Sequence, residues 1–164
     1  DYFDVRYKLV KSNKNNLLLL TKSIKEKIAF CEFIALNKNI LPSGDYYSND
    51  GELIISIREY LPNTTTPARI NCINKQIELN RKIIYDRTVQ QVVIYLLHEL
   101  AHCFENKDEN DEIEADKNAL KYFIKLNYSP NEAQRGYAQM FINRPTELNK
   151  KRYIILKKIL KKYA

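Results

Sequence analysis

The chain's only two histidines lie four residues apart, in the pentapeptide His98-Glu99-Leu100-Ala101-His102. On a helix, this spacing places both imidazoles on one face, about one turn apart, where they can bind one metal ion. Glu99 follows the first histidine and could take a proton from water at that metal. The pattern therefore predicts a metal site that activates water for the hydrolysis of peptide bonds.

The residues around the motif favour a buried helix. Residues 92–97, directly before the histidines, are nearly all apolar, and we expect a helix over residues 87–105. Two histidines on an ordinary amphipathic helix are usually surface or core residues, and the bare motif occurs by chance in unrelated proteins. Buried imidazoles, however, need polar partners. The apolar context therefore favours the metal site over a chance match.

A catalytic zinc site with two histidines needs a third protein ligand and an open position for water. Residues 111–116 offer carboxylates at the start of another predicted helix, over residues 112–126. Glu112 and Asp116 share one face of that helix, whereas Glu114 points elsewhere. We expect one of the pair to bind the metal and the other to accept the second ring proton of a ligand histidine.

One Zn²⁺ per chain is the cofactor that these ligands predict. The metal would lower the pKa of its water toward about 7 and polarise the scissile carbonyl. Glu99 would take the proton from that water and pass it to the leaving amine, so it is not expected to be a ligand. The chain has no third histidine to stabilise the oxyanion. Arg144 is our preferred candidate for that task, with Arg152, Tyr128 and Tyr137 as alternatives.

Composition indicates one globular domain over residues 1–164. The chain is 45% hydrophobic and 29% charged, and its 164 residues can bury a core without metal or disulfide staples. No apolar stretch approaches the roughly 18 to 20 residues that span a bilayer, so we expect a soluble protein. The chain begins with Asp1 and not with methionine, so we expect that an N-terminal piece was processed off or left out. A signal peptide could have been part of that piece, and the compartment is left open.

Cys31, Cys72 and Cys103 form an odd set without CxxC spacing, which predicts reduced, buried thiols.

The net charge of +7 is concentrated near the C-terminus, in Lys150, Lys151, Arg152, Lys157, Lys158, Lys161 and Lys162. We expect this to be a solvated helix face and not a nucleic-acid site, because no base-stacking aromatic pattern accompanies the lysines. The opposite, buried stripe would be formed by Leu148, Ile155, Leu156, Ile159, Leu160 and Tyr163.

The other elements predict a mixed α+β fold. We expect helices over residues 16–37, 129–142 and 146–162, strands over 52–60, 68–73 and 76–84, and a break over 37–51. A small, mostly antiparallel sheet (residues 1–86, with the first helix) would pack on the histidine helix, followed by C-terminal helices (residues 87–164). A peptide or protein substrate would lie antiparallel to an exposed strand edge. The segment expected to form that edge is Gln76, Ile77, Glu78, Leu79 and Asn80.

Three motifs follow one another in the order of a known family. Residues 96–102 carry HExxH, residues 112–116 read Glu-Ile-Glu-Ala-Asp, and residues 126–130 end in Tyr-Ser-Pro. This order resembles the gluzincin metallopeptidases of the HtpX heat-shock and CAAX prenyl endopeptidase type, which carry HExxH, then ExxAD, then a similar turn. The resemblance covers about residues 71–160 and implies a zincin-like fold and zinc-dependent peptide hydrolysis. It also implies that Glu112 is the third ligand and that Asp116 is the aspartate of ExxAD.

The resemblance has further matches and three departures. Residues 143–145 and 152–154 are similar to the family's threonine-histidine-proline and arginine-isoleucine elements. Arg144, however, stands where the family has the histidine. Only ten positions separate His102 from Glu112, much fewer than is usual in the family, and the family's membrane helices are absent. The chain would therefore be a minimal, soluble version.

Two other functions compete with this prediction. One is a regulatory peptidase resembling the ImmA and IrrE type, which cuts one specific repressor. That group tends to have asparagine where this chain has Asp116, and no helix-turn-helix segment is visible. The other is a non-catalytic basic binding protein in which a metal only stabilises the fold.

Overall fold

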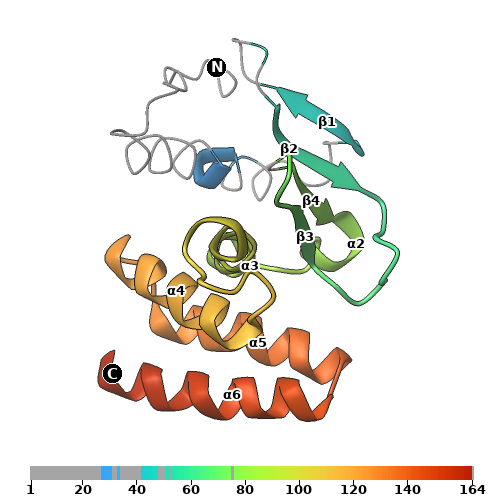
Figure 1. Cartoon of the computed structure of the whole chain (residues 1–164). Coiled ribbons are helices and arrows are strands. Elements are labelled where there is room, and N and C mark those ends of the chain that lie inside the picture. The colour runs from blue at the N-terminus through green and yellow to red at the C-terminus, as the bar shows by residue number, and fades with distance from the viewer. Residues whose placement is uncertain are drawn as a thin grey trace, which may run out of the picture.

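The computed structural model describes residues 27–30, 33, 42–47, 51, 53–74 and 76–163, without the side chain of Phe104. Within these residues a four-stranded sheet is followed by a group of helices (Figure 1). The strands are β1 (Gly44–Tyr47), β2 (Leu53–Arg58), β3 (Ala68–Asn71) and β4 (Gln76–Asn80). The helices are α2 (Arg81–Ile84), α3 (Val89–Phe104), α4 (Glu112–Lys125), α5 (Pro130–Asn143), α6 (Glu147–Leu160) and the 3-10 helix η2 (Lys161–Tyr163).

The mixed α+β class is confirmed, with two differences in the strands. Residues 44–47, predicted as part of a break, form β1 and pair antiparallel with β2. The strand predicted over residues 76–84 ends at Asn80, whose side-chain amide donates to the carbonyl oxygens of Thr64 and Thr66. The chain then turns into α2. Most of the helix predicted over residues 16–37 lies outside the described residues, but residues 27–30 and 33 are helical.

The strand order is β1-β2-β4-β3, and two of the three pairings are antiparallel. β4 pairs parallel with β2 on one side and antiparallel with β3 on the other. The prediction that residues 76–80 form an exposed edge is therefore wrong, because β4 is an inner strand. Period-2 patterning identifies a strand but carries no information on which strands flank it. The edge strand next to α3 is β3.

α3 lies at the centre of the molecule, between the sheet and the other helices (Figure 1). It begins with a capping box in which Thr88 and Gln91 each bond the other's backbone amide. Residues 92–97 are all buried, as predicted. α5 approaches α3 closely because Gly136 has no side chain, and a Cβ there would lie 3.3 Å from Cγ of Gln91.

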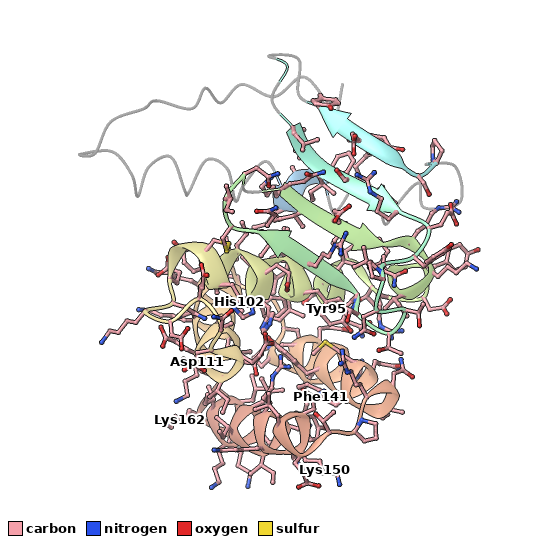
Figure 2. All side chains as sticks on the ribbon, turned by 45° about the vertical axis from the view of Figure 1, so that its right-hand side comes forward. Tyr95, His102, Asp111, Phe141, Lys150 and Lys162 are labelled. Carbon is pink, nitrogen blue, oxygen red and sulfur yellow. A yellow bond between two sulfur atoms is a disulfide. The ribbon has the colours of Figure 1, made fainter. Side chains whose placement is uncertain are left out.

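α6 is the outermost helix; Lys150 lies on it, and Lys162 lies in η2, which directly follows it (Figure 2). All six lysines of the basic set are exposed, whereas Arg152 is buried. The predicted apolar stripe is only partly correct, because Leu156 and Leu160 are buried but Leu148 and Tyr163 are about half exposed. No helix within the described ranges is long and apolar enough to cross a membrane.

Cys72 and Cys103 form a disulfide, with 5.3 Å between their Cα atoms. The expectation of reduced thiols is wrong for this pair, and Cys31 lies outside the described residues. Spacing along the chain could not reveal the bond, because its two cysteines come from the β3–β4 turn and from the last turn of α3. The fold brings these distant segments together.

Glu78 on β4 forms ion pairs with arginines of both neighbouring strands, so its contribution to stability tests the observed strand order. Its carboxylate, 16% exposed, accepts hydrogen bonds from Nε of Arg58 at 2.8 Å and Nε of Arg69 at 2.6 Å. Burial alone would raise the pKa of Glu78, but the two arginines outweigh it and lower the pKa below the usual 4.5.

Because the pKa of Glu78 is lower in the folded state, its stabilisation is present above pH 4.5 and is lost as the pH falls through the folded-state pKa. We expect Glu78→Gln to lower the free energy of unfolding by about 1 kcal/mol at pH 7, with the difference from wild type shrinking below pH 4.5. Urea unfolding between pH 3 and 7 measures this. A difference that is constant across that range would contradict the assignment.

Candidate metal centre

Three side chains from two helices meet at one point. His98 and His102 come from successive turns of α3, and Glu112 is the first residue of α4. The two Nε2 atoms lie 3.1 Å apart. Oε2 of Glu112 lies 3.0 Å from Nε2 of His98, and Oε1 lies 3.1 Å from Nε2 of His102. The histidines are buried and Glu112 is partly exposed, so these three residues lie close enough to bind one metal ion.

The second ring nitrogens face oxygen atoms that can accept a hydrogen bond but cannot donate one. Nδ1 of His102 lies 2.5 Å from the backbone carbonyl oxygen of Glu109, and Nδ1 of His98 lies 2.9 Å from Oδ1 of Asp116. Both surroundings favour a proton on Nδ1. In the neutral rings, each Nε2 then directs a lone pair at the same point as the Glu112 carboxylate. Three converging lone pairs repel one another unless positive charge lies between them.

The pKa values of His98 and Glu112 also indicate that positive charge is stabilised at this point. Burial alone would lower the pKa of His98, but Asp116 and Glu112 outweigh it and raise the pKa to about 10. Burial would raise the pKa of Glu112, yet its two histidine neighbours and Arg152 hold it well below the usual range. A proton or a divalent cation can supply the charge that the carboxylates stabilise here, and a metal ion would displace the proton.

Asp116 and Arg152 form a buried ion pair that contacts the candidate ligands. Nε and Nη2 of Arg152 each donate to an oxygen of Asp116 at 2.8 Å, and Nη1 donates to Asn149 at 3.1 Å. Nη1 of Arg152 also lies 3.3 Å from Oε2 of Glu112, and its guanidinium packs 5.0 Å from the centre of the Phe141 ring. Burial would raise the pKa of Asp116, but Arg152 and His98 lower it overall. Arg152 thus keeps Asp116 ionised beside His98.

Glu99 lies on α3 between the two histidines and is partly exposed. Burial raises the pKa of its carboxyl group, and the neighbouring imidazoles offset this in part. Glu99 lines two clefts, and so does Glu112. The clefts therefore meet at the candidate metal centre.

The first cleft, of about 710 Å³, follows residues 69–73 and reaches Glu109 and Asn110. The second, of about 450 Å³, follows residues 65–68 and is walled by Tyr137, Met140 and Leu148. Residues 65–73, which include the edge strand β3, therefore run along both clefts.

The four residues predicted as candidates for stabilising the oxyanion do not lie together. Arg144 is exposed and lines the second cleft. Tyr137 lines the same cleft, but it is 1% exposed and its hydroxyl has no hydrogen-bond partner among the described residues. Tyr128 packs on the Phe123 ring, 5.1 Å between ring centres, and is not part of either cleft wall. Arg152 is held by Asp116.

Sequence reasoning missed two groups near the ligands: Asn149, which accepts from Arg152, and the carbonyl oxygen of Glu109, which faces His102. Asn149 is a polar residue within the C-terminal helix, and nothing in the sequence marked it as buried. Its role follows only from the burial of Arg152, which needs hydrogen-bond acceptors. The carbonyl oxygen of Glu109 could not be found from residue types, because every residue carries one.

The comparisons with known proteins gave no relative: no family model, no curated protein and no solved structure matches the chain. The assignment of the site therefore depends on the geometry of its own side chains.

Metal titration tests the site directly. We expect His98→Ala to abolish stoichiometric binding of a divalent ion, because two of three ligands do not hold it. Asp116→Asn should weaken binding by roughly 10- to 100-fold, since a neutral amide replaces the carboxylate that faces Nδ1 of His98 and pairs with Arg152. Competition with a chromophoric chelator measures both affinities. Glu147→Gln, which changes a side chain that is 93% exposed, is the matched control. Equal affinities in all four proteins would refute the site.

Proposed function

We propose that the protein is a zinc-dependent metallopeptidase of gluzincin type. The observation that carries this proposal is the convergence of two imidazoles and one carboxylate at the meeting point of two clefts. A purely structural metal site would be closed, with protein ligands on every side. Here the candidate centre borders open clefts that can admit a peptide.

The donor set and its spacing favour zinc. Two imidazole nitrogens and one carboxylate oxygen form a common protein ligand set of catalytic zinc. Tetrahedral zinc with bonds of about 2.0 to 2.1 Å separates its donor atoms by about 3.3 Å. The separations in this protein, 3.0 to 3.1 Å, lie within a few tenths of an ångström of that value. Small movements of the side chains would therefore be enough to accommodate the ion.

The remaining chemistry falls to the chain's own residues. Bound zinc would supply a Lewis acid that acidifies water and polarises a carbonyl. Glu99, whose pKa is raised by burial, would accept a proton in one step and return it to the leaving amine in the next. Arg144, on the wall of the second cleft, would donate to the oxyanion. Asp116 and Arg152 would hold His98 and Glu112 in position.

The substrate would be an extended peptide bound along β3. β3 pairs with β4 on one side, and no other strand of the described part pairs with its outer side. An extended peptide can add to such an edge through main-chain hydrogen bonds. Because residues 65–73 run along both clefts, a peptide bound there would cross the candidate metal centre.

Removal of the proposed base separates catalysis from metal binding. We expect Glu99→Gln to bind zinc with one ion per chain and to cleave peptides about 10²- to 10⁴-fold more slowly, because proton transfer from water is lost. Peptide cleavage followed by mass spectrometry, together with metal analysis, measures both effects.

Glu105→Gln, at the end of the same helix, is the control for Glu99→Gln and should behave as wild type. Cleavage by Glu99→Gln at the wild-type rate would rule out the proposed mechanism. If the wild type binds zinc but cleaves only one protein and no general peptides, the regulatory type of peptidase is favoured. If it binds zinc and cleaves nothing, the metal is structural.

The second cleft predicts a preference for an apolar residue beside the scissile bond. Its walls include Met140 and Tyr137, with buried Ala68 at its edge. We expect Met140→Asp to lower kcat/KM for peptides with a large apolar residue at that position by about tenfold or more, because a charge on the cleft wall disfavours apolar contact. Sequencing the products of a peptide library measures the preference. Ile142→Asp, at a residue of α5 that is 75% exposed, is the control. An unchanged preference in Met140→Asp would show that this cleft does not select the substrate.

A further inference from the structure

The Cys72–Cys103 disulfide joins the wall of the first cleft to the helix of the metal ligands. Cys103 directly follows His102 on α3, and Cys72 directly follows the edge strand β3. Cys72 and the next residue, Ile73, line the first cleft together with Glu99 and His102. The bond therefore fixes the distance between a cleft wall and the candidate metal centre.

The part of this wall in β3 is held by pairing with β4, whereas among the described residues no hydrogen bond joins the turn after β3 to α3. The turn after β3 is shaped by local hydrogen bonds, from the amide of Ile73 to Asn71 Oδ1 at 2.9 Å and from the amide of Gln76 to Asn74 Oδ1 at 3.0 Å. Both bonds stay within the turn and do not reach α3. The turn is also poorly packed, since Ile73 is 95% exposed. The disulfide, in contrast, crosses from the turn to α3.

We propose that Cys72 and Cys103 are positioning residues for peptide binding: their disulfide holds the end of β3 and its turn at the spacing from the metal centre that a bound peptide requires. This inference rests on the proposed peptidase function. Preorganisation of a binding wall lowers the entropy lost on binding. Without the bond, the metal ligands would keep their positions, because Asp116, Arg152 and the Glu109 carbonyl hold them independently.

Peptide binding would then respond to the redox state of the pair. Both cysteines are partly exposed, so a reductant can be used to test the bond. A trialkylphosphine breaks the S–S bond to give two thiols, while the phosphine takes oxygen from water and becomes the phosphine oxide. An oxidant of the disulfide class restores the bond by thiol–disulfide exchange and is itself reduced to thiol.

The test compares the double variant Cys72→Ser/Cys103→Ser with wild type, with zinc loaded in both. We expect one zinc per chain in each protein, a KM raised by about tenfold in the variant, and a kcat within about threefold of wild type. Phosphine treatment of a Cys31→Ser protein should reproduce the rise in KM, and reoxidation should reverse it. Serine variants are needed as well, since freed thiols can themselves bind zinc.

Two controls separate positioning from general stability. Cys31→Ser removes a sulfur atom without touching the bond and should behave as wild type. Leu160→Ala removes a buried side chain in α6 and should lower the unfolding temperature while KM is unchanged.

Three outcomes would overturn the inference. An unchanged KM in the double variant would make the bond purely stabilising, and a loss of zinc would show that it positions the ligands and not the peptide. If wild type cleaves no peptide, the proposed function fails, and hydrogen exchange then tests the positioning alone. In that case we expect faster exchange of the amides of residues 69–74 in the double variant, with α3 unchanged. Equal exchange in that segment would also overturn the inference.

Discussion

The buried pair of Asp116 and Arg152 is the interaction on which the candidate site depends. A buried ion pair is costly unless nearly all of its hydrogen-bonding groups are satisfied. Here Asp116 accepts from two nitrogens of Arg152, and the third nitrogen reaches Asn149. The pair joins α4 to α6, and the contact of Asp116 with His98 extends the connection to α3. These contacts hold α3, α4 and α6 in fixed positions relative to one another, and this arrangement brings Glu112 close to the two histidines.

The charges around this pair would be balanced by a divalent cation. Glu112, Asp116 and ionised Glu99 contribute three negative charges, and Arg152 contributes one positive charge, which leaves two negative charges if both imidazoles are neutral. In a partly buried region, such an excess is expensive. Protonation of His98 or Glu99 relieves it in part, which agrees with the raised pKa values of both groups. A divalent ion would neutralise it completely. A divalent ion would thus fit both the local charge balance and the spacing of His98, His102 and Glu112.

Sequence alone predicted the parts of the site that depend on helix periodicity. The spacing of His98 and His102, and the shared face of Glu112 and Asp116, follow from 3.6 residues per turn, and these side chains do lie together. Helices α3 to α6 were predicted within a few residues of their observed ends. Predictions that required long-range pairing were less successful. Three features were missed: the inner position of β4, the strand β1 and the Cys72–Cys103 bond. Each depends on segments that only the complete fold brings together.

The short connection between α3 and α4 shows how so few residues can complete the site. Asn106 uses its side-chain amide to bond the carbonyl oxygen of Asp111, and Asp111 in turn caps α4 through the amide of Glu114. These bonds fix the path of the connection and the start of α4, where Glu112 is the first residue. The same path directs the carbonyl oxygen of Glu109 at His102. Because a backbone carbonyl performs the orienting task for one histidine, only the other needs a carboxylate, and one arginine can then hold both that carboxylate and Glu112.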